Sequence, residues 1–341
     1  MIQANRKHTI GALLGLGVAA LLIWGVDNEQ KPQYHHDAGD VFGTYYNIRY
    51  EAKSSLCDSI QAALTAFDNS LSMFNPYSIL SAVNANRDTT TDAAFEAMWA
   101  EATQVYDLSN GAFDITVGPL VNYWGFGSKN RNIDISKSRD IDSITEFVGF
   151  EKVRLENHKV IKYDARVQLD AGAVAKGQAC DMIAAVLQRQ GCENYLVDIG
   201  GEVVAHGLND KGEPWHVGIT KPNLNNEGAQ EQLQEILAVT DVKMATSGNY
   251  RNYYYADGER RSHTIDPRTG YPVQHSVLSA TVVASSCMRA DALATACMVL
   301  GQEEAMAMIA RAGDAACYLI VAQNDSLTVI KSPNWDKILT K

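Results

Sequence analysis

The feature that most constrains the fold is a series of short apolar, β-branched segments that follow one another with few helices between them. Strand-like segments cover residues 41–50, 152–169, 195–205, 216–220, 237–245, 279–284 and 317–330. Apolar residues recur at helical spacing over 55–71, 92–109, 178–190, 290–300 and 303–312. Parallel strands need a long crossover, usually a helix, between each pair. This order has too few such crossovers, so we expect an α+β fold with antiparallel sheets.

The N-terminus is different from the rest of the chain. Basic residues at 6–8 precede an uncharged, apolar run over 9–26, and acidic residues follow it. This order is typical of an export signal or an N-terminal membrane anchor, although a buried core helix is an alternative. No small-x-small cleavage site follows the run, which favours an uncleaved anchor. We therefore expect a signal sequence or membrane anchor over residues 1–26 and a polar linker over 27–39.

Charge and missing motifs exclude several classes of function. The formal net charge is −11, and an acidic surface repels phosphate backbones, so no nucleic-acid partner is expected. The sequence has no P-loop, no G-x-G-x-x-G after a strand, no G-x-S-x-G and no H-E-x-x-H. Any nucleotide must therefore be held by another device. The six cysteines form no C-x-x-C pair, and most lie in apolar stretches, which predicts buried free thiols.

Residues 170–177 (DAGAVAKG) connect a strand-like segment to the start of a helix. Small residues let the backbone approach a ligand closely, and a helix N-terminus favours phosphate. Lys176 would add a positive charge near a phosphate oxygen. A tight connection with a solvated lysine explains the same residues equally well, and this segment alone does not separate the two interpretations.

Asp291 and Thr295 are four residues apart in an apolar segment, so on a helix both side chains share one face. Carboxylate and hydroxyl oxygens are ligands that suit Mg²⁺, which takes its remaining ligands from water and substrate phosphates. The alternative is an Asp–Thr pair that satisfies itself at a helix start, where Asp291 favours the helix dipole. For this segment alone, that alternative is favoured.

Three other segments combine polar groups with tight turns. Ser247, within ATSGNY, can present its hydroxyl and neighbouring amides to an anion. His263 precedes an Asp-Pro turn at 266–270 and can orient a ring or move a proton, although DPRTG is also good turn chemistry by itself. Asp114, within GAFDITVGP, is either structural or offers its carboxylate to a heteroaromatic ring or an adenine amine.

Taken in order, these segments resemble the ApbE family of FAD:protein FMN transferases. The matching segments are FGT (42–44), SMFNPYS (72–78), GAFDITVG (111–118), LDAGAVAKG (169–177), DIGG (198–201), TSGNY (246–250), SHTIDPRTG (262–270) and ADALAT (290–295). The resemblance implies a single compact α+β domain over residues 40–335, related to the T-fold, with FAD in a cleft.

The resemblance also implies roles for individual residues. The expected FAD contacts, with Ser247 added as the anion-binding hydroxyl, are Phe42, Phe74, Ala112, Phe113, Asp114, Asp170, Lys176, Ser247 and Ile265. Mg²⁺ is expected at the Ala173 carbonyl, Asp291 and Thr295, and the expected catalytic residues are His263 and Asp291. The family often has Met at position 42 and Tyr at position 74.

The activity implied by the resemblance is covalent flavinylation. The pyrophosphate of FAD is cleaved, FMN passes to a Thr or Ser hydroxyl in a short Asp-Gly-containing segment, and AMP leaves, with Mg²⁺ neutralising the developing charge. The implied partner is a subunit of a membrane redox complex, at the periplasmic face of the inner membrane. The alternatives are an FAD diphosphatase, in which water replaces the hydroxyl, and a non-catalytic flavin carrier. The combination of Asp291 with Thr295 makes the carrier the least favoured.

Overall fold

The computed structural model describes residues 31–127, 141–222, 232–249, 253–256, 259–323 and 326–339. The predicted signal sequence or anchor over 1–26 lies outside the described residues. Among those described, one helix, Cys287–Ala312, is long and apolar enough to cross a membrane, but 61% of its apolar window is buried inside the protein. It is therefore placed as a core helix of the domain.

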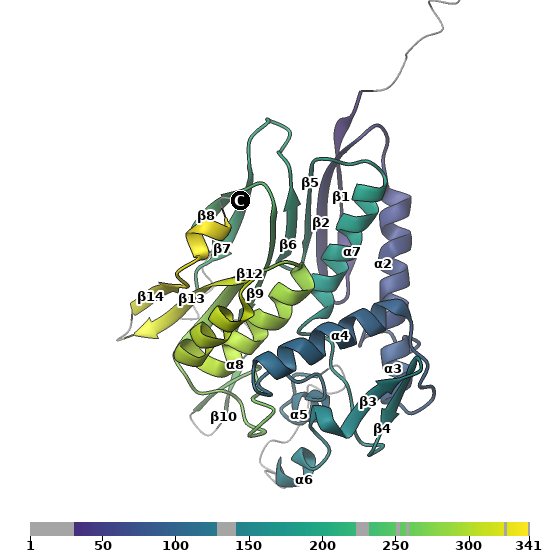
Figure 1. Ribbon diagram of the computed structural model, residues 1–341, viewed down its shortest axis with the longest axis vertical. Coiled ribbons are helices and arrows are strands. Elements are labelled where there is room, and N and C mark those ends of the chain that lie inside the picture. The colour runs from purple at the N-terminus through teal and green to yellow at the C-terminus, as the bar shows by residue number, and fades with distance from the viewer. Residues whose placement is uncertain are drawn as a thin grey trace, which may run out of the picture.

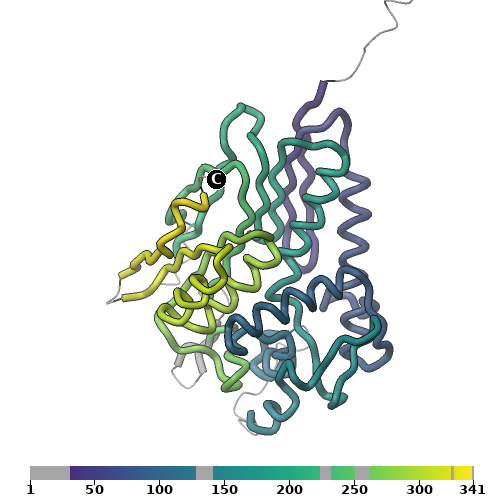
Figure 2. Tube along the Cα trace, viewed as in Figure 1, coloured from purple at the N-terminus to yellow at the C-terminus, as the bar shows by residue number. Residues whose placement is uncertain are grey.

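One eight-stranded sheet organises the chain, and every neighbouring pair in it is antiparallel (Figure 1). Its strands, in sheet order, are β1 (Gln33–Val41), β2 (Thr44–Ala52), β5 (Tyr195–Ile199), β6 (Glu202–His206), β9 (Val242–Gly248), β12 (Val277–Val283), β13 (Ala316–Gln323) and β14 (Ser326–Lys331). In Figure 2 the first hairpin, in purple, and the last, in yellow, lie at opposite edges of this sheet. The predicted antiparallel α+β class is confirmed.

Four helices cover one face of the sheet, and side-chain alternation explains why they pack there. They are α2 (Cys57–Leu71), α4 (Ala93–Leu108), α7 (Ala175–Arg189) and α8 (Cys287–Ala312). Along β2, Tyr46, Ile48 and Tyr50 are buried and belong to the large core cluster shared with these helices. Successive side chains of a strand point to opposite faces, so one strand supplies both the core and the open face.

The opposite face is only partly covered. A separate hairpin, β7 (Trp215–Thr220) and β8 (Leu233–Val239), and the short helix α9 (Trp335–Ile338) pack over the half of the sheet near β6, β9 and β13, and form a second core cluster there. A third group of elements lies below the sheet in Figure 1. It comprises α3 (Ile79–Asn84), α5 (Gly118–Tyr123), α6 (Ile141–Thr145), η1 (Phe150–Lys152), β3 (Val153–Glu156) and β4 (Lys159–Lys162), with the hairpin β10 (Tyr253–Ala256) and β11 (Glu259–Ser262) nearby.

Local sequence signals explain several element ends. Asp92 begins α4 by accepting a 2.9 Å hydrogen bond from the Phe95 amide. The helix is followed by Asn110 and Gly111, both with positive φ (52° and 77°). The predicted hairpin turn at Asn157 and His158 is also confirmed, because both residues have positive φ (50° and 60°) between β3 and β4. Such values suit a two-residue hairpin turn.

Other boundaries differ from the sequence prediction. The linker predicted over 27–39 is wrong for residues 33–39, because β1 begins at Gln33 and pairs with β2 along its whole length. The segment 195–205 is two strands joined at Gly200 and Gly201, both with positive φ. The predicted strand ahead of residue 170 is reduced to one isolated bridge between Val117 and Gln168.

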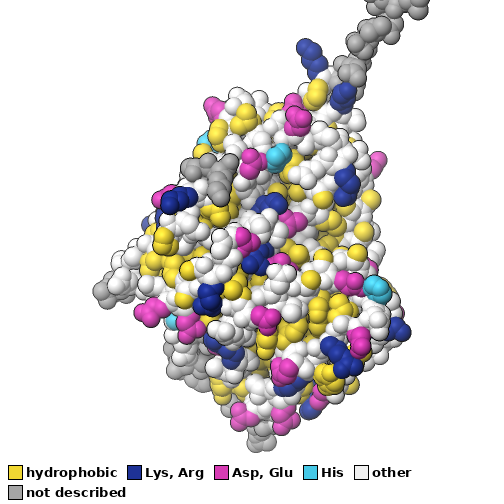
Figure 3. Space-filling model, in the orientation of Figure 1, with side chains coloured by type: hydrophobic (Ala, Val, Ile, Leu, Met, Phe, Trp, Pro, Cys, Tyr) yellow, Lys and Arg dark blue, Asp and Glu magenta, His cyan; other side chains and the backbone are white. Residues whose placement is uncertain are grey.

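The molecular surface seen from the helical side is mixed in character. In Figure 3, Lys and Arg side chains alternate with Asp and Glu over the visible face, with hydrophobic side chains between them. A surface of mixed sign gives no broad electrostatic field on this side. The feature that distinguishes the molecule is instead a large cleft.

Candidate active site

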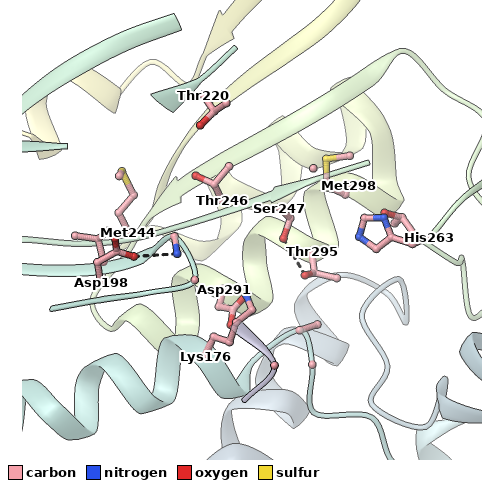
Figure 4. Close-up of a pocket in the computed structure, with 18 of the residues that line it drawn as sticks. Lys176, Asp198, Thr220, Met244, Thr246, Ser247, His263, Asp291, Thr295 and Met298 are labelled. Atoms are coloured by element: carbon pink, nitrogen blue, oxygen red, sulfur yellow. Dashed lines mark hydrogen bonds between the residues drawn. The ribbon is translucent and has the colours of Figure 1, made fainter. Parts of the chain in front are cut away.

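A cleft of about 2040 Å³ lies where the sheet meets the elements below it and continues over the open face of the sheet. Its walls come from β2, β5, β7, β9, the first turn of α7, the middle of α8, and the loops near residues 112–117, 170–173 and 263–267. Every predicted site residue lines it except Phe42, so the fold brings together side chains as far apart in sequence as Phe74 and Thr295. Figure 4 shows the central part of this cleft.

A close contact between two helices sets the position of Asp291. The Asp291 Oδ2 accepts a 3.0 Å hydrogen bond from the amide of Gly177, in the first turn of α7. A Cβ atom on Gly177 would lie 2.3 Å from the Cys287 carbonyl oxygen and 2.9 Å from the Asp291 Cβ. Only glycine fits at that distance, because nonbonded carbon and oxygen atoms pack no closer than about 3 Å. The glycine predicted for close backbone approach therefore serves a helix–helix contact.

Lys176 has an ion partner that the sequence did not indicate. Its Nζ lies 2.6 Å from Oε1 of Glu202, whose side chain is 2% exposed. The other carboxylate oxygen of Glu202, Oε2, is buried and has no hydrogen-bond partner among the described residues. A buried oxygen without a donor is costly, and such groups call for an explanation. Glu202, Lys176 and Asp291 form what we call the buried charge cluster.

Burial and mutual charge shift all three pKa values of this cluster upward. Burial raises the pKa of Glu202, against the lowering effect of Lys176. Burial also raises the pKa of Asp291, again against Lys176. Burial alone would lower the pKa of Lys176, but the charges of Glu202 and Asp291 outweigh it and the pKa is raised. The cluster holds two carboxyl groups against one ammonium group, so it favours the uptake of a further positive charge.

The donors near this cluster fit a hard divalent cation. Thr295 lies one turn after Asp291 on α8, and its hydroxyl is 3.1 Å from the Ser247 hydroxyl on β9 (Figure 4). Ala173 lines the same cleft. Each of Asp291 and Thr295 therefore has a partner on another element, so the predicted alternative of a mutually satisfied Asp–Thr pair is wrong. In the described ranges no three His, Cys, Asp or Glu side chains converge as a metal site. Mg²⁺ commonly uses one or two carboxylates and completes its shell with water and phosphates.

His263 lies at the far side of the cleft from Asp198 in Figure 4, with Ser247 and Thr295 between them. Its ring meets that of Phe126 edge-on, with the centroids 6.1 Å apart. The turn after it is built as predicted: the amide of Gly270 donates to the Asp266 carbonyl at 2.8 Å, and Gly270 has a φ of 81°. Ile265 is buried in the small core cluster with Leu120 and Trp124. A rigid turn and core contact thus hold the imidazole at the cleft wall.

Asp114 and Asp170 both line the cleft, but their carboxylates already have main-chain partners. Asp114 accepts hydrogen bonds from the amide and hydroxyl of Thr116, each at 2.7 Å, and from the Phe150 amide at 3.0 Å. Burial raises the pKa of Asp114 from 3.8 to about 6 despite these bonds. Asp170 accepts from the Gly172 amide at 2.7 Å, and burial raises its pKa. Of the two interpretations for Asp114, the structural one accounts for both of its oxygens.

The two predicted aromatic contacts differ. Phe74 is 62% exposed at the mouth of the cleft and packs against the backbone at Gly43. Phe42 does not line the cleft; its ring packs on Phe67 with the centroids 5.3 Å apart. Phe42 has a φ of 51° in the tight turn between β1 and β2, which turns its side chain into the core. Phe42 is therefore not among the residues that line the cleft, and its predicted contact with FAD stays a prediction.

Three groups of residues at or behind the cleft were given no role in the site from the sequence. They are Glu202, which lies behind Lys176, the polar residues Asn47, Arg49 and Asp198 on the open face of β2 and β5, and the strand β7. Glu202 alone carries a local signal, because it is a charged residue opening the apolar strand EVVA. The others depend on which strands become neighbours, and a single sequence does not contain that information.

The chain is similar to known proteins over nearly its whole length. The model of the ApbE family matches residues 42–319. The FAD:protein FMN transferase of Vibrio cholerae is 37% identical over 322 residues, which is 92% of this chain and 95% of that protein. The FAD:protein FMN transferase of Escherichia coli K12 is 34% identical over 344 residues, covering 96% of this chain and 97% of that protein. The structure of the flavin transferase ApbE from Vibrio cholerae has a TM-score of 0.81 at 34% identity, and covers 90% of this chain and 99% of that chain.

Proposed function

The chain belongs to the ApbE family and is an FAD:protein FMN transferase, and we propose that it moves FMN from FAD to a serine or threonine hydroxyl of a partner protein, with Mg²⁺ as cofactor and AMP as the second product. The observation that carries the proposal is the meeting of Asp291, Thr295 and Lys176 in one cleft. Two oxygen donors and an ammonium group at one place suit a pyrophosphate with its counter-cation.

The reaction we propose exchanges one phosphorus–oxygen bond for another. The acceptor hydroxyl oxygen forms a bond to the phosphorus of the FMN half, while the bond from that phosphorus to the bridging oxygen breaks and AMP leaves. The hydroxyl proton passes to His263, whose ring lies at the wall of the cleft. Histidine suits this step because its usual pKa is near neutrality.

The remaining residues bind and orient. Lys176, held by Glu202, directs its ammonium group toward the phosphates, and the Ser247 hydroxyl, 3.1 Å from Thr295, is available to a phosphate oxygen. Asp291, Thr295 and the Ala173 carbonyl are the groups proposed to hold the cation. When bound there, Mg²⁺ would neutralise the charge that develops on the phosphate oxygens. Phe74 and Phe113 offer apolar surface at the cleft for a flavin or adenine ring.

The experiment mixes the purified chain with FAD, MgCl₂ and a short synthetic peptide that contains Asp-Gly followed by threonine, and reads the intact mass of the peptide. We expect the mass of the peptide to increase by that of one FMN less one water. This increase should be absent when EDTA is added and absent with the Asp291→Ala enzyme. The same variant should retain most of its FAD binding, measured by flavin fluorescence, because the metal ligand contributes less to nucleotide binding than to turnover. An active Asp291→Ala enzyme would remove the metal assignment.

The main competing activity uses the same site with water as the nucleophile. An FAD diphosphatase would release FMN and AMP and leave the peptide unmodified. The mass experiment separates the two activities directly, because only the transferase adds mass to the peptide. Bound FAD that survives Mg²⁺ unchanged would instead support the non-catalytic flavin carrier.

A further inference from the structure

We propose that the part of the cleft beyond the buried charge cluster binds the acceptor segment of the partner protein, as an extended strand along the free edge of β7 with an acidic side chain at Arg49. We call this part the acceptor groove; its walls are Asn47, Arg49, Leu196, Asp198, His216 and Gly218. The proposal rests on the proposed function, because it supplies the second substrate of that reaction.

The size of the cleft is the first reason. Sites for small molecules and cofactors are typically about 300–1000 Å³, and this cleft is about 2040 Å³. The cleft is therefore about twice the upper end of that range. The residues assigned to FAD and Mg²⁺ lie in the half near α7, α8 and His263, whereas the acceptor groove has no role in holding either. The volume therefore has room for a second ligand beside the first.

The edge of β7 is the second reason. This strand pairs only with β8 in the parts of the chain that the structure describes. His216, Val217 and Gly218 line the cleft consecutively. Gly218 has no side chain, so it lines the cleft through its main-chain atoms. A strand that lines a cavity with consecutive residues does so with its edge, where the main-chain amides and carbonyls are not paired within the sheet.

The hydrogen-bond pattern gives the direction of these main-chain groups. The Lys221 amide donates to the Gln232 carbonyl at 2.8 Å, toward β8. Successive residues of an antiparallel strand direct their main-chain hydrogen bonds to opposite sides. The register shift between Ile219 and Thr220 is a bulge whose extra residue lies on β8, not on β7. The alternation along β7 is therefore unbroken and turns the amides of His216 and Gly218 away from β8. An extended peptide can add there as a third strand.

Charge is the third reason, and it specifies the chemistry of the segment. Arg49 is exposed on the open face of β2, opposite Leu196 in the sheet register. Its guanidinium has no ion pair or hydrogen bond with any side chain in the described ranges. Lys176 and Lys211 also line the cleft, and Lys176 is already paired with Glu202. An unpaired guanidinium at the wall of a groove favours a carboxylate on the ligand.

The groove is continuous with the site of the proposed reaction. The turn between β5 and β6 joins the two, because Asp198 accepts a 2.9 Å hydrogen bond from the Gly201 amide on that turn. On the same turn, the Cβ position of Gly200 is 3.4 Å from Cδ of Lys176. An acceptor segment that passes over β5 in the groove therefore ends beside Lys176. A hydroxyl group at that end of the segment would lie next to the phosphates of bound FAD.

The test measures binding of the same peptide, fluorescein-labelled, by fluorescence polarisation without FAD or Mg²⁺. Arg49→Glu should weaken binding at least tenfold, and more at low salt, because charge reversal repels the acidic side chain. Arg189→Glu is the matched control: Arg189 is exposed at the end of α7 on the helical face, and this variant should bind as wild type. His216→Pro should weaken binding at least tenfold by removing one edge amide, whereas His216→Ala, which removes a wall side chain but keeps that amide, should weaken binding much less.

The outcomes distinguish this inference from the proposed function. Wild-type-like binding by Arg49→Glu and His216→Pro, with unchanged FAD binding as the check on folding, would overturn the acceptor groove, whether or not FMN is transferred. Loss of binding in both, with Arg189→Glu unaffected and His216→Ala much less affected than His216→Pro, would support the groove. If such a peptide bound but gained no FMN in the presence of FAD and Mg²⁺, the groove would stand and the proposed transfer would fail.

Discussion

At the scale of single residues, the site depends on a lysine that is held by one carboxylate and faces another. The Lys176 Nζ lies 2.6 Å from Oε1 of Glu202. Burial acts on the pKa values of both Lys176 and Asp291. Glu202 is thus a positioning residue, because it acts on the substrate through Lys176. Removing one partner of a buried ion pair leaves the other uncompensated, which costs more than the pair itself contributes.

Glu202→Ala should lower the free energy of unfolding by about 3 kcal/mol. This is the low end of the range for buried pairs, because the Lys176 side chain is 31% exposed. Glu202→Gln should lose less, since an amide oxygen can still accept from Lys176. Urea unfolding of the three proteins measures the difference, and Glu202→Ala unfolding at the wild-type midpoint would contradict the buried pair.

Asp114 gives a pH dependence with a definite sign. Its pKa is raised from 3.8 to about 6 by burial, so ionisation opposes folding. The protonated Asp114 side chain stabilises the folded protein fully at pH values below its pKa in the unfolded chain. This stabilisation is lost as the pH rises through its pKa in the folded protein. The stability of wild type relative to Asp114→Asn, which does not titrate, should therefore fall by about 2–3 kcal/mol between about pH 4 and pH 7. A constant or rising difference, by chemical denaturation at each pH, would be incompatible with a buried carboxylate.

At the scale of elements, the contact between α7 and α8 positions the site. Within a helix, alanine is generally more favourable than glycine, by up to about 1 kcal/mol. Gly177→Ala would nevertheless place a methyl group 2.3 Å from the Cys287 carbonyl oxygen. We expect a loss of about 1–3 kcal/mol in stability and a lower rate of transfer, because the helices must separate at Asp291. Thermal unfolding measures the sign, and a stabilised variant would show that the helices do not meet here.

Elements were predictable where their signals are local. Asp92 before α4, the turn at Asn157 and His158, and the alternation along β2 all operate within a few residues. β1 was predicted as a linker because its sequence is polar, and an edge strand with an exposed face needs few apolar residues. The position of the Phe42 ring has a related cause, since a tight turn rather than the residue type decides that it packs on Phe67.

The candidate site was predictable in its members but not in its pairings. The motifs named the side chains that line the cleft, with Phe42 as the exception. The pairs Lys176–Glu202, Asp291–Gly177 and Ser247–Thr295 each join different elements. Such pairs follow from the sheet order and the helix packing, which the residue types alone do not specify. The acceptor groove could not be predicted at all, because it depends on one free strand edge.

At the scale of the whole molecule, we propose that the enzyme works at the periplasmic face of the inner membrane, on a subunit of a membrane redox complex. The basic residues at 6–8 and the apolar run over 9–26 support this proposal. The full chain expressed in a bacterium should fractionate with membranes, whereas a chain starting at residue 31 should remain in the soluble fraction. Both should transfer FMN to the peptide in vitro, because β1 begins at Gln33. A full chain found only in the soluble cytoplasmic fraction would refute the anchor.

The most direct test of FMN transfer to an acceptor hydroxyl is the stoichiometry of the two products. AMP released and FMN bound to the acceptor peptide are quantified together by chromatography over one time course, with saturating FAD and Mg²⁺. We expect one AMP for each flavinylated peptide, with little free FMN, since the acceptor hydroxyl takes the place that water would take in hydrolysis. AMP accompanied by an equal amount of free FMN, and by unmodified peptide, would contradict transfer and identify a diphosphatase.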